Sequence, residues 1–205
     1  MGQAKKITNN GNIAVSDKST GVYIKNGSFT NGESGVISVS GIEAKGIEIE
    51  KGSVVNEGTV EVKDGAIGIN INGGDVHNSG KIVASGVNTD GVRIEKGTFA
   101  TDNKSVIEVK GSDKLTVIED EDGKNKTLSE ASGVKLNGTS NFVNNGIIKV
   151  TGTTDGTYSG YQSKGININS ATASAENKGT IIVDRNGIGV GTKGTFILSL
   201  IHISE

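Results

Sequence analysis

The sequence contains no cysteine, no proline and no tryptophan, and only seven of its 205 residues are phenylalanine or tyrosine. Without cysteine, a disulfide framework and a cysteine-ligated metal are both excluded. With so few aromatic side chains, a globular core centred on aromatic rings is excluded as well. No run approaches the roughly 18 consecutive apolar residues of a membrane-spanning helix, and the first residues contain no apolar centre of a signal peptide.

An excess of charge of one sign is also lacking. The formal net charge is -2, because 21 Lys and Arg are interleaved with 23 Asp and Glu. Nucleic-acid-binding proteins usually carry a basic stripe, so nucleic acid is not an expected partner. The hydrophobic fraction of 33% is too high for a disordered polyelectrolyte. The electrostatics therefore identify no class of partner.

Glycine and short alternating segments are abundant instead. In residues 46–62, GIEIEKGSVVNEGTVEV, Ile47 and Ile49 point one way while Glu48 and Glu50 point the other. This period of two indicates a half-buried β-strand. The Gly and Asn residues that follow tolerate the left-handed backbone of a tight corner. The local unit is therefore strand, corner, strand.

The chain repeats this unit seven times. A first half-motif, Gly-x-Ile-x-Val or a close variant, begins at Gly11, Gly35, Gly58, Gly80, Ser105, Gly146 and Gly179. A second half-motif, Gly-Ile-x-Ile, begins at Gly21, Gly46, Gly68, Gly91, Gly133, Gly165 and Gly187. The spacing of 22–25 residues between early copies widens to 41 and 33, which places insertions at residues 111–131 and 152–164.

Stacking the copies aligns five columns that are expected to face inward. The first half-motif supplies Ile13, Ile37, Val60, Ile82, Ile107, Ile148 and Ile181, followed by Val15, Val39, Val62, Ala84, Val109, Val150 and Val183. The second supplies Val22, Ile47, Ile69, Val92, Val134, Ile166 and Ile188, followed by Ile24, Ile49, Ile71, Ile94, Leu136, Ile168 and Val190. The fifth column is Phe29, Val54, Val76, Phe99, Phe142, Ala173 and Phe196.

One column of the second half-motif is expected to face solvent and to share no chemistry: Tyr23, Glu48, Asn70, Arg93, Lys135, Asn167 and Gly189. A different series of Asn residues precedes the first half-motif. These residues are expected to hydrogen bond to one another along the stack, as in cross-β ladders. They are Asn9, Asn31, Asn56, Asn78, Asn144 and Asn177.

A single coil cannot fold alone. About five buried side chains contribute roughly 1.5 to 3 kcal/mol each, whereas ordering about 23 residues costs roughly 1 to 2 kcal/mol per residue. Stacked coils gain ladder hydrogen bonds and apolar neighbours on both sides. The sequence therefore predicts an all-β fold over residues 1–197, a single-stranded parallel β-helix (β-solenoid) of about seven coils of about 22–25 residues. Right-handed winding is expected from the general handedness of parallel crossovers.

The alternation of Asn-x-Gly-[Thr/Ile/Lys]-[Ile/Val]-x-Val units with Gly-[Ile/Val]-x-Ile units resembles the passenger region of autotransporters. These are type V secreted, often virulence-associated surface proteins of Gram-negative bacteria, and the likeness is greatest to large adhesins of low-GC species. The resemblance covers residues 7–197. It implies export through the periplasm, translocation through a C-terminal outer-membrane barrel and folding at the cell surface.

The resemblance further implies a non-enzymatic structural stalk without cofactor or catalytic residues. Such a segment presents loops to a host-cell or bacterial surface protein or glycan. Residues 198–205, LSLIHISE, break the repeat and resemble a translated sequencing adapter. We therefore expect a non-native tail here, on an internal piece of a longer protein whose barrel lies in a missing C-terminal part.

β-Helix folds also carry polysaccharide lyases and hydrolases, which gather carboxylates on adjacent rungs of one face. Here Glu48, Glu50 and Glu95 are expected to be scattered over a solvated face. Asp90 falls at a corner, where Asp is common. A fragment of a carbohydrate-active β-helix enzyme, with its active face on missing rungs, is the alternative reading.

The two insertions fall at the same corner of adjacent coils and are expected to emerge side by side. The first predicts a hairpin with an Asp-Gly turn, because its carboxylates do not match the spacing of an EF-hand; weak calcium binding is the alternative. The second carries two of the three Tyr, which suit recognition of protein or glycan. Insertions without any ligand would be equally tolerated there. The candidate partner-binding residues are Asp120, Glu121, Asp122, Lys124, Tyr158 and Tyr161.

Overall fold

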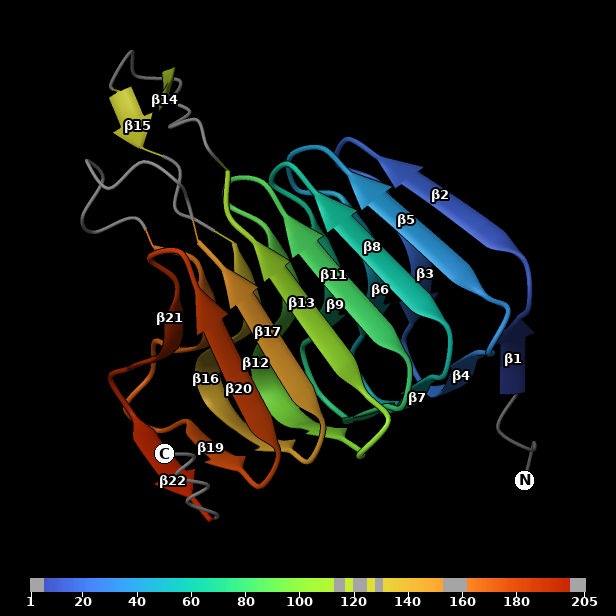
Figure 1. The fold of residues 1–205 in the computed structure, drawn as a ribbon. Coiled ribbons are helices and arrows are strands. Elements are labelled where there is room, and N and C mark those ends of the chain that lie inside the picture. The colour runs from blue at the N-terminus through green and yellow to red at the C-terminus, as the bar shows by residue number, and fades with distance from the viewer. Residues whose placement is uncertain (1–5, 113–116, 120–124, 128–130, 153–161, 200–205) are drawn as a thin grey trace.

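The structure, a computed structural model, describes residues 6–112, 117–119, 125–127, 131–152 and 162–199. Every regular element in these ranges is a β-strand, and no helix is present among them (Figure 1). The same ranges hold no helix long and apolar enough to cross a membrane. The prediction of an all-β fold is confirmed.

The first half-motif forms a seven-stranded parallel sheet, in which each copy pairs with the next copy along the chain. Its interior residues pair as expected, Ile37 with Val60 and Ile82 with Ile107 among them. The strands are β2 (Asn12–Ser16), β5 (Val36–Ser40), β8 (Thr59–Lys63), β11 (Lys81–Ser85), β13 (Val106–Lys110), β17 (Ile147–Thr151) and β20 (Thr180–Asp184).

The remaining parallel strands belong to a 13-stranded sheet made of two ladders. The ladder of the second half-motif comprises β3 (Thr20–Ile24), β6 (Lys45–Ile49), β9 (Ile67–Ile71), β12 (Asp90–Thr101), β16 (Ser132–Asn144), β18 (Lys164–Ile168) and β21 (Ile188–Thr192). The other ladder, which ends at the Asn column, comprises β1 (Lys6–Asn9), β4 (Gly27–Asn31), β7 (Gly52–Asn56), β10 (Asp75–Asn78), β19 (Ser174–Asn177) and β22 (Thr195–Leu198). The C-terminal halves of β12 and β16 complete it, because these two strands run through the intervening corner.

Glycine begins the second half-motif because two coils approach each other closely there. A Cβ added to Gly68 would lie 2.5 Å from the carbonyl oxygen of Gly91 and 2.7 Å from the Cγ2 atom of Val62. No side chain fits in that space. The same glycine-to-glycine contact links Gly133 to Gly165, and Gly165 to Gly189.

The register of the last coil differs from the sequence prediction by two residues. Ile166 pairs with Val190 and Ile168 with Thr192, so Gly189 and not Gly187 continues the glycine column. The outward column accordingly ends at Gly191. In the Phe column, Phe142 pairs with Ala175 instead of Ala173. Both shifts preserve the strand face, since the side-chain period is two.

The core consists of the predicted inward columns, and in the central coils these side chains are 0–3% exposed. Phe99 and Phe142 stack with ring centroids 5.1 Å apart. Burial falls at the last coil, where Val183 is 44% exposed although it belongs to an inward column. Each inward side chain therefore depends on neighbours from the coils on both sides.

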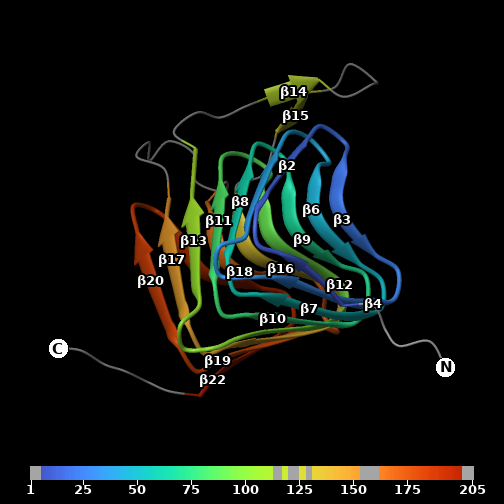
Figure 2. The same cartoon turned by 90° about the vertical axis from the view of Figure 1, so that its right-hand side faces the viewer.

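Three parallel ladders, each pairing one copy of the repeat with the next, surround a common apolar interior (Figure 2). This arrangement is consistent with a parallel β-solenoid. It leaves one face of every strand outside, and these outer faces and the corners between ladders are where any functional site must lie.

Candidate functional site

The corner between the seven-stranded sheet and the second ladder has a left-handed backbone. Asp17, Glu43, Asp64, Asn88 and Asn186 all have φ between 30° and 63° there. Two of the coils lack this tight turn, since β13 and β16, and β17 and β18, are joined by the insertions. A tight exposed turn can be replaced by a longer loop without disturbing the ladders on either side.

The ends of the two insertions lie next to each other. The Gly111 amide donates to the Thr151 carbonyl at 2.8 Å, and the Lys164 amide donates to the Ala131 carbonyl at 3.0 Å. Within the first insertion, β14 (Val117–Glu119) pairs antiparallel with β15 (Asn125–Thr127). The six candidate partner-binding residues, Asp120, Glu121, Asp122, Lys124, Tyr158 and Tyr161, lie outside the described residues.

The prediction that the outward column of the second half-motif shares no chemistry is wrong for Tyr23, Glu48 and Asn70, although Tyr23 faces solvent as expected. Asn70 is only 5% exposed. Its amide donates to the Glu48 Oε1 atom at 3.1 Å, and the Tyr23 hydroxyl donates to Glu50 at 2.7 Å. Further along the same face, Asn137 donates to Glu95 at 2.8 Å. Neighbouring coils are therefore joined outside the core as well as inside it.

Glu48 is the centre of this outer network. Lys45 donates to its Oε1 atom at 2.6 Å, and Asn72 donates to the same atom at 3.1 Å. Burial on its own raises the pKa of Glu48. The hydrogen bond and charge of Lys45 and the amide hydrogen bonds of Asn72 and Asn70 outweigh that effect, so the pKa lies below its ordinary value.

Asp90 is the second centre, and its interpretation as an ordinary corner residue is wrong. Its side chain is 2% exposed at the start of β12. Arg93 donates to it through both Nε, at 2.7 Å, and Nη2, while Lys135 of the next coil lies 3.6 Å away. The charged partners compensate the buried carboxylate, because an unpaired one would be strongly destabilising.

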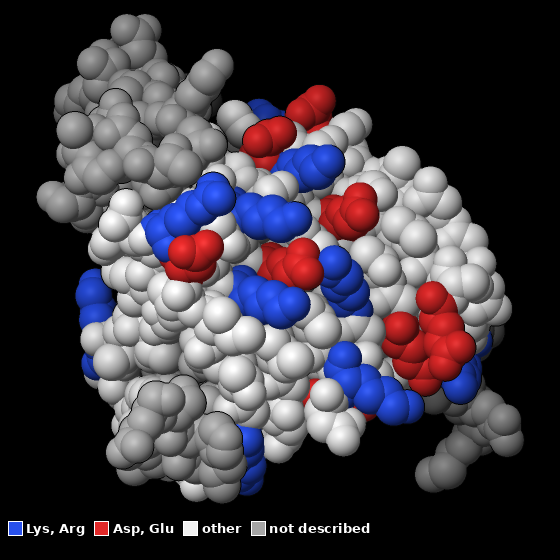
Figure 3. Space-filling model, in the orientation of Figure 1, with Lys and Arg blue, Asp and Glu red and all other residues white. Residues whose placement is uncertain are grey.

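A ladder of alternating charge covers the outer face of β8, β11, β13 and β17 (Figure 3). Glu108 lies 3.1 Å from Lys81 and 3.7 Å from Lys110. Burial alone raises the pKa of Glu108, but the hydrogen bond and charge of Lys81 and the charges of Lys110 and Lys149 lower it below its ordinary value.

The lowered pKa values of Glu48 and Glu108 predict that the protein loses stability in acid. Because their folded pKa lies below the ordinary value of 4.5, their stabilisation is complete above that value and disappears as the pH falls through the folded pKa. Each contributes less than about 1 kcal/mol, since the pairs are partly exposed. The urea concentration at the unfolding midpoint should be lower at pH 3 than at pH 7. Glu108→Gln should reduce this difference between the two pH values. Glu33→Gln, at an exposed corner, is the control; an unchanged difference in Glu108→Gln would contradict the assignment.

The corner before the first half-motif is held by the predicted Asn ladder. The Nδ2 atom of Asn31 donates to the Oδ1 atom of Asn56 at 2.8 Å, and Asn56 donates to Asn78 at 2.6 Å. Each of these amides also donates to a nearby backbone carbonyl, that of Gly58 for Asn56. The predicted hydrogen bonding along the stack is confirmed.

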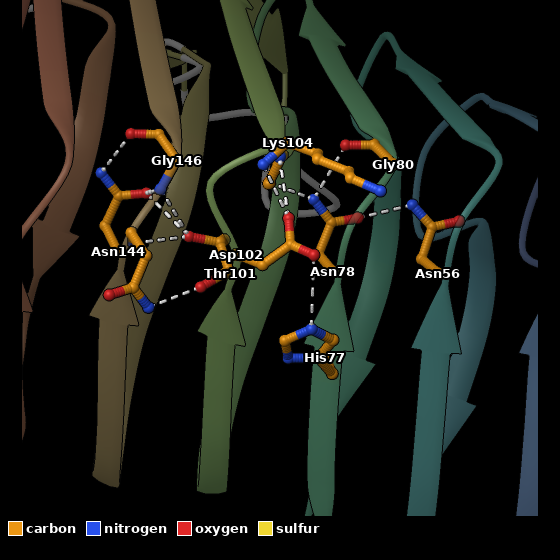
Figure 4. Close-up of polar contacts among 11 residues, drawn as sticks. Asn56, His77, Asn78, Gly80, Thr101, Asp102, Lys104, Asn144 and Gly146 are labelled. Atoms are coloured by element: carbon orange, nitrogen blue, oxygen red, sulfur yellow. Dashed lines mark hydrogen bonds and ion pairs between the residues drawn. The ribbon is translucent and has the colours of Figure 1, made fainter.

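One coil interrupts the ladder (Figure 4). Thr101 occupies the Asn column, and Asn78 donates to the Ser105 hydroxyl at 2.5 Å instead. The Thr101 hydroxyl then donates to Asn144 at 2.9 Å, which restores the chain of contacts. At the far end Leu198 pairs with Asn177, so an apolar residue stands where earlier coils have Asn.

The only histidine of the described residues lies beside this interruption. The His77 Nε2 atom is 3.9 Å from Asp102, whose carboxylate accepts hydrogen bonds from the backbone amides of Lys104 and Ser105. Burial raises the pKa of Asp102, but those amides, the Ser79 hydroxyl and His77 together lower it below its ordinary value. Asp102 therefore caps a turn. No group of three potential metal ligands occurs among the described residues.

Comparison with known proteins gives no assignment: no family model, no curated protein and no solved structure matches the chain.

Proposed function

We propose that the chain is a non-enzymatic stalk segment of a cell-surface adhesin, built as a right-handed parallel β-solenoid of seven coils. The observation that carries this proposal is the continuity of the apolar columns from coil to coil, together with the Asn ladder on both sides of the Thr101 coil. A stack stabilised by nearest-neighbour contacts can be lengthened coil by coil without a new core. Such a stack is suited to holding interaction elements away from the cell surface.

The two insertions are the elements that this stalk would present. Their ends lie side by side at one corner. The acidic tip of the first and the Tyr residues of the second, Tyr158 and Tyr161, would form one surface for a protein or glycan of a host or bacterial cell. Tyr joins apolar area to a hydroxyl at low entropic cost, which favours recognition.

Trimming both insertions tests this role. Residues 111–131 and 152–163, which end just before the strand residues Ser132 and Lys164, are replaced by the short corner Asp64-Gly65-Ala66 of the third coil, in the intact passenger displayed on cells. Folding should be retained, because that corner already connects the same two ladders. Cell or glycan adhesion should fall at least about tenfold, the loss of roughly 1.4 kcal/mol of binding. Unchanged adhesion by the folded, trimmed passenger would place the binding surface elsewhere.

The repeat grammar and the lack of cysteine support an autotransporter passenger as the source of this segment. The protein would then be exported, anchored through an outer-membrane barrel encoded beyond residue 197, and displayed at the cell surface. The complete open reading frame tests this, since it should carry a signal peptide and a C-terminal barrel. Recovery of the codons for residues 198–205 from native mRNA would contradict the interpretation of that segment as an adapter.

A carbohydrate-active β-helix enzyme is the second candidate, favoured by Asp90, Arg93 and Lys135 meeting on adjacent strands. The cluster supports a structural role better, because the carboxylate is 2% exposed and covered by its two cations. Incubation with acidic polysaccharides separates the two. Sustained bond cleavage that Asp90→Asn abolishes would establish the enzyme and contradict the stalk.

A further inference from the structure

A lysine, a carboxylate and two carboxamides meet at one oxygen atom on the outer face of β6 and β9. The Glu48 Oε1 atom accepts hydrogen bonds from Lys45 Nζ at 2.6 Å, from Asn70 Nδ2 at 3.1 Å and from Asn72 Nδ2 at 3.1 Å. Elsewhere in the described part of the chain, no lysine contacts a carboxylate oxygen that also accepts from an asparagine amide.

We propose that Lys45 and Asn70 react to form an intramolecular isopeptide bond, with Glu48 transferring the proton. Glu48 takes a proton from the Lys45 ammonium, and the neutral Nζ attacks the Asn70 Cγ atom. The Nζ to Cγ bond forms and the Cγ to Nδ2 bond breaks. Glu48 returns its proton to the departing nitrogen, which also takes the second proton lost by Nζ. An ammonium side chain and a carboxamide thus become a secondary amide and a free ammonium ion.

The hydrogen bonds place the reacting groups for this exchange. The nucleophile and the leaving nitrogen both contact Oε1, so a single oxygen can pass a proton from one to the other. Backbone pairing fixes the groups, since Glu48 and Asn70 are direct partners in the ladder and Lys45 pairs with Ile67. Holding an amine and an amide on the same carboxylate oxygen raises their effective concentration above that of a free amine in solution.

Burial of the reacting groups favours attack on the Asn70 amide by the Lys45 amine over attack by water. Asn70 is 5% exposed, and the Glu48 and Lys45 side chains are 15% and 29% exposed. The low exposure of these side chains limits the access of water to the reacting groups.

Asn70 is a better acceptor than Asn72. Asn70 is buried, and its amide is further fixed by a hydrogen bond to the Asn72 Oδ1 atom at 3.2 Å. Asn72 is exposed and precedes Gly73. Water and the following backbone amide therefore compete at Asn72. The bond would join consecutive coils covalently, independently of the function proposed above.

Mass spectrometry of the folded, full-length chain tests the inference. The intact mass should be about 17 Da, one ammonia, below the mass that the sequence requires. Succinimide formation at an Asn-Gly pair loses the same mass, so peptide mapping is needed. Trypsin should fail to cleave after Lys45, and fragmentation should locate a branched peptide joining Lys45 to Asn70.

Variants separate the chemistry from folding. Lys45→Arg keeps the positive charge beside Glu48, and Glu48→Gln keeps the side-chain shape; both should restore the full mass while the far-UV spectrum stays β-rich. Lys63→Arg, on the outer face of β8, is the matched control and should keep the cross-link. A folded wild-type chain with a free Lys45, a loss of ammonia that persists in Lys45→Arg, or a branch at Asn72 would each overturn the assignment.

Discussion

Ile71→Asp should abolish folding. Ile71 lies in the middle of an inward column, is 0% exposed and pairs with Ile49 and Ile94 of the neighbouring coils. The substitution removes roughly 1.5 to 3 kcal/mol of apolar burial and introduces a carboxylate whose burial costs several kcal/mol more. A domain with about 5 to 15 kcal/mol of stability loses most or all of it. Far-UV circular dichroism and urea unfolding measure the result.

The control lies one residue further along the chain. Asn72→Lys introduces a charge as well, but at an exposed position beside Glu48, where a cation is compatible with the network. Its urea midpoint should stay within the equivalent of about 0.5 kcal/mol of the wild type. A tolerated Ile71→Asp together with a destabilising Asn72→Lys would mean that the strand faces are exchanged, because a one-residue slip reverses every side chain.

Asn70→Asp, although on the outward face, is not an equivalent control. Sequence reasoning expects it to be silent, since Asn70 alternates with buried Ile69 and Ile71. The structure places Asn70 in hydrogen-bond contact with Glu48, so an Asp there would set two carboxylates side by side. We expect a loss of about 1 kcal/mol or more.

The alternation and spacing of the repeat predict the parallel ladders and the core because each inward position recurs in every copy. Ile37, Val60 and Ile82 align in this way. The prediction is wrong at Ile188 and Ala173, where Gly187-Ile188-Gly189-Val190 and Ala173-Ser174-Ala175 each offer two registers that differ by two residues. A shift of two preserves the face, so the apolar pattern cannot distinguish the registers.

The outer networks were missed for a different reason. A periodic pattern gives the direction in which a side chain points, but it does not give the lateral contacts between coils. Asp90 meets Lys135 across the first insertion, more than 40 positions along the chain. The outward column does carry a signal, since it holds Glu48, Asn70 and Arg93, whose side chains can all hydrogen bond across one rung.

Asn56→Ala should have the second largest effect among these predictions. Asn56 is 0% exposed and lies between Asn31, which donates to its Oδ1 atom, and Asn78, which accepts from its Nδ2 atom. Alanine leaves a hydrogen of the Asn31 amide and an oxygen of Asn78 buried without these partners, and the Gly58 carbonyl loses a donor. An unsatisfied buried polar group costs about 1 to 3 kcal/mol. We expect a total loss of about 2 to 5 kcal/mol, measured by urea unfolding.

Two further substitutions separate the ladder from a general effect of losing Asn. Asn26→Ala, at an exposed corner, should change stability by less than about 0.5 kcal/mol. Thr101→Asn combined with Ser105→Gly gives the interrupted coil the Asn and Gly that the other coils use, so Asn78 and Asn144 gain an asparagine between them. That double variant should be at least as stable as the wild type, because both neighbours keep hydrogen-bond partners. A stable Asn56→Ala chain together with a destabilised double variant would mean that the asparagines mark the corner without supporting it.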